Sequence, residues 1–291
     1  MASANEIIEG YRLRSLLQSG VDSQVFEVIE TRSNRHFAMK LLHPEAAKKT
    51  EKRALIFNEA EAGIKLRHEN VIHILKVCRD EHHPHFIMEY FPSGSLRSKL
   101  MAKDMAFIKE NARAIFRQLS TGLAYMHGNG WVHCDIKPDN ILVNAAGQLR
   151  LIDFAISKKV PTGFAKWFYR RKKAQGTPSF MSPEQARGEM PDPRQDIYSL
   201  AATYYELLTG RPPFKGSSIQ DILNKQVGLK PESPANHNPD VSDEMAALIL
   251  KMLAKKKEDR PQTCHDVMIA LRKIRIYKSQ PIPPEDEQQM R

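Results

Sequence analysis

Cysteine is scarce in this chain of 291 residues, and its three cysteines, Cys78, Cys134 and Cys264, are an odd number at wide spacing. They form neither a disulfide framework nor a CxxC zinc motif, so we expect free thiols in a reducing compartment. Long apolar runs are also missing. The stretch 245–250 is far too short to span a bilayer, and residues 1–10 lack the apolar core of a signal peptide. The sequence therefore predicts a cytoplasmic chain without a membrane segment.

Strong compositional bias is absent as well. Hydrophobic residues make up 41% of the chain and charged residues 27%, which is ordinary for soluble globular proteins and excludes disorder, collagen and disulfide-stapled miniproteins. This length suits one large domain or two smaller ones. Lys and Arg number 44 against 34 Asp and Glu, a net charge of +10. Such an excess suits either a solvated surface or an anionic partner; no nucleic-acid partner is predicted.

The hydrophobic pattern changes once along the chain. Residues 11–88 are mostly strand-like, for example at 25–29 and 36–41, with a single helical stretch at 52–66. After the breaker cluster 91–95 the pattern becomes helical, with helices expected at 107–126, 194–209, 218–226, 242–254 and 264–276. We therefore predict an α+β fold with a small β-rich lobe (11–90), a hinge (91–94) and a larger α-helical lobe (95–280), followed by a loose tail (281–291).

The segment His-Cys-Asp-Ile-Lys-Pro-Asp-Asn at 133–140 carries the clearest chemical signal. An Asp followed five residues later by an Asn, after His-x, matches the catalytic loop of protein kinases. Phosphoryl transfer needs a carboxylate to orient the attacking hydroxyl, and cations to hold the phosphate charge. Asp135 suits the first task, Lys137 and a metal on Asn140 the second. Taken alone, the segment is also compatible with a hydrophilic loop that leads into the strand 141–143.

Four further motifs complete the required chain order, two before this segment and two after it. Lys40 ends the strand-like run Phe-Ala-Met-Lys, and Glu59 lies on the helix of the first lobe, where it can pair with Lys40. Asp153 follows in Ile-Asp-Phe, and Ser-Pro-Glu at 182–184 comes last. Each is unremarkable alone, but chance does not supply all of them in one order.

With these motifs in place, the chain resembles the eukaryotic-type Ser/Thr protein kinases, especially the bacterial ones, over about residues 11–276. Further matching segments are 176–186, 196–200 and 206–214. The resemblance implies a two-lobed kinase fold with a kinase domain at 11–280. It also implies transfer of the γ-phosphoryl group of ATP to Ser or Thr of protein substrates, with Mg²⁺, or alternatively Mn²⁺, as cofactor. Lys137 and Thr177 resemble the Ser/Thr-specific branch.

The resemblance also assigns roles to individual residues. Asp135, Lys137, Lys40 and Glu59 would be catalytic, and Asn140 and Asp153 would bind the metal. The residues expected to bind ATP are Leu17, Gly20, Val25, Ala38, Lys40, the gatekeeper Met88, Glu89, Phe91 and Leu142. Two structural roles are implied as well: Asp196 would anchor the catalytic loop, and Glu184 would pair with Arg260.

Several positions depart from the family pattern. Gln18 and Ser23 stand where the phosphate-covering loop has glycines, so we expect backbone strain there and a weaker hold on the nucleotide. Gly63 lacks the apolar side chain usual at its place, and Ala155 replaces the glycine after Asp153 and Phe154. Together these departures keep an alternative open, a pseudokinase that binds nucleotide as a scaffold. A small-molecule kinase is disfavoured by the intact segment 176–184, which small substrates do not need.

Cys134 replaces the arginine that usually precedes the catalytic Asp, so the chain is of the non-RD type. That arginine normally pairs with a phosphorylated activation loop, and we therefore predict activity without loop phosphorylation. Cys134 itself is either a reactive thiol or a passive small residue.

The activation segment 154–183 contains no acidic residue but carries the positive residues Lys158, Lys159, Lys166, Arg170, Arg171, Lys172 and Lys173. This charge suits a solvated loop or the docking of an acidic partner.

Overall fold

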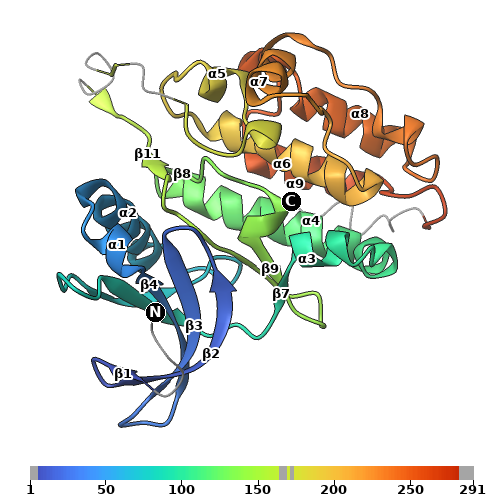
Figure 1. Ribbon diagram of the computed structural model, residues 1–291. Coiled ribbons are helices and arrows are strands. Elements are labelled where there is room, and N and C mark those ends of the chain that lie inside the picture. Colours follow the sequence, from blue (N-terminus) through green and yellow to red (C-terminus); the bar gives the residue numbers. More distant parts are fainter. Residues whose placement is uncertain (1–5, 164–168, 171–173, 282–291) are drawn as a thin grey trace. The chain divides into compact units, whose positions relative to one another are not determined.

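The structure, a computed structural model, describes residues 6–163, 169–170 and 174–281 of the chain (Figure 1). The chain divides into two compact units: an N-terminal unit, Met1–Pro92 with Ile152–Ile156, and a C-terminal unit, Ser93–Leu151 with Ser157–Arg291. Beyond Pro281 the predicted tail lies outside the described residues, as do Lys166 and Arg171–Lys173 of the basic segment.

The N-terminal unit is built on a six-stranded antiparallel sheet with the strand order β1-β2-β3-β4-β6-β5. Its elements are β1 (Ile7–Ile8), β2 (Tyr11–Ser19), β3 (Ser23–Glu30), β4 (His36–Leu42), α1 (Pro44–Ala47), α2 (Thr50–Lys65), β5 (Ile74–Cys78) and β6 (His85–Glu89). The predicted strands at 25–29 and 36–41 lie within β3 and β4, and the predicted helix at 52–66 is α2.

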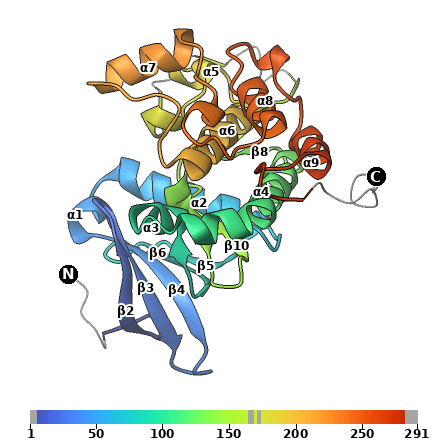
Figure 2. The ribbon, with the colours of Figure 1, turned by 90° about the vertical axis from the view of Figure 1, so that its right-hand side faces the viewer.

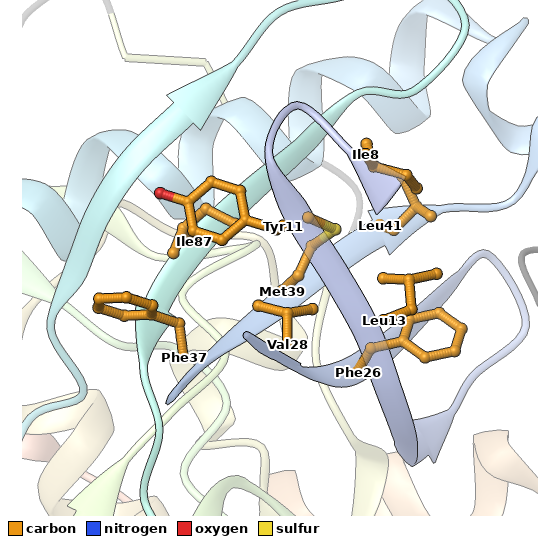
Figure 3. Close-up of a cluster of buried hydrophobic side chains, with 9 residues drawn as sticks. All are labelled: Ile8, Tyr11, Leu13, Phe26, Val28, Phe37, Met39, Leu41 and Ile87. Atoms are coloured by element: carbon orange, nitrogen blue, oxygen red, sulfur yellow. The ribbon is translucent and has the colours of Figure 1, made fainter. Parts of the chain in front are cut away.

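The two faces of this sheet differ because successive side chains of a strand point to opposite sides. One face carries a buried apolar cluster, shown in Figure 3, that consists of Ile8, Tyr11, Leu13, Phe26, Val28, Phe37, Met39, Leu41 and Ile87. Burying a large apolar side chain contributes roughly 1.5–3 kcal/mol, so this face holds the unit together. The alternate residues Val25, Ala38 and Lys40 of β3 and β4 therefore lie on the other face.

The C-terminal unit is mainly helical (Figure 2). Its helices are α3 (Leu96–Met101), α4 (Met105–Gly128), α5 (Pro183–Ala186), α6 (Pro193–Thr209), α7 (Ile219–Gly228), α8 (Asp243–Met252) and α9 (Cys264–Lys273). Short strands β7 (Gly94–Ser95), β9 (Ile141–Val143) and β10 (Leu149–Leu151) form one sheet, and β8 (Trp131–Val132) pairs with β11 (Lys158–Lys159). Short 3₁₀ turns lie at Pro138–Asn140, Pro178–Phe180, Pro234–Asn236 and Lys257–Asp259.

Helices α4 and α6 form the centre of this unit. The rings of Phe116 and Tyr204 stack with centroids 3.9 Å apart, and the Tyr204 hydroxyl donates to the Phe116 carbonyl at 2.8 Å. Helix α9 packs against α4 (Figure 2) and ends at Lys273, so the predicted helix at 264–276 was too long. At this end Arg113 of α4 donates to the carbonyl of Leu271 at 3.0 Å and to that of Ile274, the residue after the helix, at 2.9 Å.

The predicted division into a β-rich part followed by a helical part is therefore present. Among the described residues, no helix is both long and apolar enough to cross a membrane.

Candidate functional site

In the N-terminal unit, a lysine and two acidic side chains meet beside the sheet. The Nζ atom of Lys40, on β4, lies 2.6 Å from Oε2 of Glu59 on α2 and 3.4 Å from Oδ1 of Asp153. Glu59 is buried, with 4% of its surface exposed. Burial alone would lower the pKa of Lys40, but the carboxylates of Glu59 and Asp153 raise it above its usual value. The amine is therefore positively charged, and the expected pairing of Lys40 with Glu59 is present.

The strand register places predicted nucleotide-binding residues on one face of the sheet. Val25 is opposite Lys40, and Ala38 is opposite Met88. Directly opposed residues point to the same side of a sheet, so these side chains share the face that lies opposite the apolar cluster. Leu17 lies in the exposed part of β2, and Gly20 lies in the turn that follows this strand. Leu142, the remaining member of the predicted set, lies on β9 of the C-terminal unit.

The turn after β2 is unstrained, contrary to our expectation. Gln18 belongs to β2 and Ser23 to β3, and neither is among the described non-glycine residues with positive φ. The Gly20 N–H donates to the Ser23 carbonyl at 2.8 Å, which closes the turn without a further glycine. Asp22 forms an ion pair with Lys52 of α2 at 2.5 Å, which offsets its negative charge. Replacing Gln18 and Ser23 by glycine would therefore relieve no strain.

Asn58 fixes the segment that contains Asp153. Its Nδ2 donates to the carbonyl oxygens of Phe154 at 3.2 Å and Ala155 at 2.9 Å. Asp153 has a left-handed backbone with φ of 69°, a conformation that costs on the order of 1–3 kcal/mol in a non-glycine residue and needs such support. Sequence reasoning missed Asn58, because an amide next to Glu59 on a helix gives no pattern of its own.

Gly63 of α2 makes room for Ile74 of β5. A Cβ atom at position 63 would lie 2.5 Å from Cδ1 and 2.6 Å from Cγ1 of Ile74, which is itself 1% exposed. The apolar volume expected from residue 63 is thus supplied by Ile74, and the glycine is a packing requirement rather than a defect.

This packing predicts that the effect of Gly63→Ala on the free energy of unfolding changes sign when Ile74 is replaced by alanine. In the wild-type background the added methyl group overpacks the core, so we expect the free energy of unfolding to fall by about 1 kcal/mol or more. With Ile74→Ala the obstacle is gone, and alanine should stabilise α2 by up to about 1 kcal/mol over glycine. Urea unfolding of the wild type, both single variants and the double variant measures this cycle. Equal effects of Gly63→Ala in both backgrounds would contradict the packing account.

In the C-terminal unit, Asp196 of α6 anchors the loop 133–140, as predicted. Its buried carboxylate accepts from the backbone N–H of His133 at 2.7 Å and of Cys134 at 2.9 Å, and from His127 Nε2 at 2.9 Å. Burial by itself would lower the pKa of His127, but the neighbouring Cys264 and the hydrogen bond to Asp196 raise it to about 10. The imidazolium therefore balances the buried carboxylate. These bonds hold Cys134 at a left-handed φ of 69°.

The same loop presents Asp135 with both carboxylate oxygens engaged. Oδ1 accepts from the Thr177 N–H at 3.0 Å and hydroxyl at 2.9 Å, and Oδ2 accepts from Asn140 Nδ2 at 3.0 Å. Lys137 Nζ lies 2.7 Å from Oδ2 and donates to the Thr177 hydroxyl at 2.6 Å. Asp135, Lys137 and Asn140, predicted from one motif, are thus joined in space by Thr177, forty residues further along the chain.

Cys134 is a passive residue. It is 4% exposed, and burial, followed by the negative charge of Asp196, raises the pKa of its thiol far above the ordinary value. Its carbonyl accepts from Gln185 Nε2 at 2.6 Å. A small cavity adjoins it, lined by Lys158, Tyr169, Gln175, Gln185 and Glu189 among others. The Tyr169 hydroxyl donates to the Glu189 carbonyl at 3.2 Å.

The predicted pairing of Glu184 with Arg260 is present and fully buried. Arg260 Nη1 and Nη2 donate to the two carboxylate oxygens of Glu184 at 2.6 and 2.9 Å.

Only Lys158, Lys159 and Arg170 of the basic segment lie among the described residues, so an acidic partner for this segment stays a prediction.

Comparison with known proteins identifies the family. Residues 11–270 match the protein kinase domain, so the chain belongs to the protein kinase family, and the predicted two-lobed kinase fold class is confirmed. Its relatives place it with the eukaryotic-type Ser/Thr kinases of bacteria. It is 30% identical to serine/threonine-protein kinase PknB of Mycobacterium leprae over 285 residues, 97% of this chain and 45% of that protein.

Two other relatives agree. The chain is 30% identical to serine/threonine-protein kinase PknB of Mycolicibacterium smegmatis, over 96% of this chain and 45% of that protein. It is also 30% identical to a probable serine/threonine-protein kinase of Streptomyces coelicolor, over 89% of this chain and 39% of that protein. The chain thus spans less than half the length of these relatives.

Proposed function

We propose that this chain is an active protein kinase, which transfers the γ-phosphoryl group of ATP to Ser or Thr side chains of protein substrates. The observation that carries the proposal is the setting of Asp135. Hydrogen bonds from Thr177 and Asn140, and the charge of Lys137, hold its carboxylate in one orientation. A pre-oriented carboxylate is what alignment of an attacking hydroxyl requires.

The Lys40–Glu59 pair supports an active enzyme over a silent scaffold. Glu59 and Asp153 keep the Lys40 amine charged at the edge of the face that carries Val25 and Ala38. We propose that Lys40 binds the α- and β-phosphates, while Glu59 orients Lys40 without contacting the nucleotide. Lys137 would bind the γ-phosphate, because a lysine amine is a compact positive charge suited to phosphate.

The proposed metal ligands are oxygen donors, which fit a hard cation such as Mg²⁺ or Mn²⁺. Asn140 donates its Nδ2 hydrogens to the carbonyl and carboxylate of Asp135 at 2.9 and 3.0 Å, so its amide oxygen is the atom turned to other partners. Asp153 supplies the second ligand from the N-terminal unit. When bound, such an ion neutralises phosphate charge that develops during transfer.

The adenine ring would contact Val25, Ala38 and Met88 on the face of the sheet that lies opposite the apolar cluster. The other proposed contacts are Leu17, Gly20, Phe91 and Leu142. At Glu89 the backbone N–H already donates to the His73 carbonyl at 3.0 Å. Any adenine contact there therefore uses the carbonyl oxygen of Glu89 as acceptor.

We propose residues 11–280 as the kinase domain and the cytoplasm as its compartment. The three cysteines support the second point because all are free thiols in the structure.

Transfer of label from γ-labelled ATP to a generic basic protein, with Mg²⁺ or Mn²⁺, tests the proposed activity, and phosphoamino-acid analysis separates Ser and Thr from Tyr. We expect label on Ser and Thr at a rate far above that of Asp135→Asn. ATP binding with no transfer above that control would favour the pseudokinase scaffold.

Activity should not depend on phosphorylation of the activation segment. Cys134 is small, buried and neutral, so it cannot act as a receptor for a phosphate group. We expect phosphatase-treated enzyme, checked by mass spectrometry at Thr162, Tyr169 and Ser179, to retain most of its initial rate. A roughly tenfold fall in the initial rate is equivalent to about 1.4 kcal/mol of barrier. Such a fall, if rephosphorylation restored the rate, would contradict this prediction.

A further inference from the structure

Three side chains with metal-binding atoms converge in the N-terminal unit, away from Lys40 and Asp153. They are Glu9, Cys78 and His85, and a carboxylate oxygen, the thiol sulfur and a ring nitrogen lie within 4.8 Å of one another. Cys78 Sγ donates to Glu9 Oε1 at 3.0 Å. Cys78 is 9% exposed and His85 only 1%, whereas Glu9 is exposed.

The backbone brings these residues together from distant parts of the sheet. Cys78 of β5 and His85 of β6 are directly opposite each other in the strand register. Glu9 lies in the two-residue turn between β1 and β2, where Glu9 and Gly10 both have positive φ, 46° and 84°, as in a type I′ hairpin. Strands β1 and β5 are the two edges of the sheet, so the contact of Glu9 with Cys78 means that the sheet curls until its edges meet.

A hydrogen bond to the backbone fixes which ring nitrogen of His85 carries the lone pair. Its Nδ1 lies 2.7 Å from the His83 carbonyl oxygen. A carbonyl can only accept, so Nδ1 carries the proton and the lone pair is on Nε2. Metal-bound histidines commonly donate their other ring N–H to a carbonyl or carboxylate, which fixes tautomer and ring orientation. In a metal site with Nε2 as the ligand atom, this hydrogen bond would be the outer-shell contact of His85.

The donor set selects the metal. A thiolate with an imidazole and a carboxylate suits Zn²⁺, which takes S, N and O ligands at about 2.0–2.3 Å in tetrahedral geometry. Such bond lengths place ligand atoms roughly 3.5 Å apart. The three atoms already lie within 4.8 Å of one another, and Cys78 Sγ and Glu9 Oε1, at 3.0 Å, would move slightly apart on binding. Lys76 lies 3.4 Å from the second oxygen of Glu9, Oε2, and thus orients the carboxylate while Oε1 faces Cys78.

We propose that Glu9, Cys78 and His85 form a Zn²⁺ site that clamps the β1–β2 turn to the β5–β6 ladder. Binding replaces the S–H bond of Cys78 by a Zn–S bond and releases the thiol proton to solvent, with no change in oxidation state. Water completes the four ligands. The metal thereby cross-links the two edges of the curled sheet, and it stabilises the N-terminal unit by binding only its folded state.

The test uses the full chain, stripped with a chelator and titrated with Zn²⁺ alone, without nucleotide. Calorimetry should show one site per chain, and the unfolding temperature should rise with Zn²⁺. Cys78→Ser and Glu9→Gln should each weaken Zn²⁺ binding at least tenfold. Glu9 is exposed, so Glu9→Gln keeps the fold and the proposal can be tested even if Cys78→Ser unfolds. Co²⁺ should give a thiolate-to-metal charge-transfer band that Cys78→Ser abolishes.

Two control variants separate this site from other binding. Cys264→Ser changes another Cys–His pair, in which Sγ lies 3.7 Å from His127 Nδ1, and should leave Zn²⁺ affinity unchanged. His82→Gln with His83→Gln removes two exposed imidazoles and should also leave it unchanged. Absence of Zn²⁺ binding, affinity insensitive to Glu9→Gln and Cys78→Ser, or binding lost with His82 and His83 would each overturn the proposal.

Discussion

Asp135→Asn should reduce the rate of phosphoryl transfer by a factor of about 10²–10⁴, the usual contribution of a positioned general base. The asparagine amide keeps the shape of the carboxylate, and its oxygen can still accept from Thr177. It cannot accept a proton from the substrate hydroxyl at neutral pH. Because Asp135 does not hold ATP in our proposal, ATP affinity should stay almost unchanged, as measured by calorimetry beside the maximal rate.

Two other aspartates provide comparison variants for this test. Asp139 lies in the same loop but pairs with Arg97 at 3.1 Å, so Asp139→Asn should transfer phosphate at nearly the wild-type rate. Asp153→Asn removes a proposed metal ligand and should weaken metal-dependent ATP binding as well as transfer. If Asp135→Asn lost ATP binding and transfer in equal measure, the assignment of the base would be wrong.

The grouping of Asp135, Lys137 and Asn140 was predictable from the sequence because the three lie in one short motif. Asp135, Lys137 and Asn140 occupy one turn and its flanks, so their spacing alone places them together. The strands that carry Lys40, Val25 and Ala38 were predictable for a similar reason, since β-branched and aromatic residues between polar turns indicate strands.

Contacts that depend on tertiary packing were not predictable. The place of Ile74 beside Gly63, and the hydrogen bonds from Asn58 to the segment after Asp153, join residues of different elements that share no motif. The predicted strain at Ser23 was wrong because a family pattern of glycines does not give φ, which in this chain is set by the register of β2 with β3. The contact of Glu9 with Cys78 was not predictable either, because it depends on the curvature of the whole sheet.

The second large effect concerns stability. Arg260→Met should lower the free energy of unfolding by about 3–5 kcal/mol, because removal of one partner leaves an uncompensated buried charge. That charge is Glu184, 3% exposed, whose carboxylate accepts two hydrogen bonds from Arg260. Arg260 also donates from Nε to the Ala254 carbonyl at 2.8 Å and from Nη1 to the Arg194 carbonyl at 2.9 Å. These acceptors would lose their donors as well, which adds to the loss.

Urea unfolding of the C-terminal unit within the full chain measures this loss, and the double variant Glu184→Gln with Arg260→Met identifies its cause. Neutralising Glu184 removes the stranded charge, so the double variant should be more stable than Arg260→Met alone. The exposed pair of Glu61 with Lys65, 2.7 Å apart on α2, is the matched control. Glu61→Gln should cost only about 0.3–0.5 kcal/mol, as helix-surface pairs do. A double variant less stable than Arg260→Met would show that the loss comes from the backbone acceptors of Arg260, and not from the buried carboxylate.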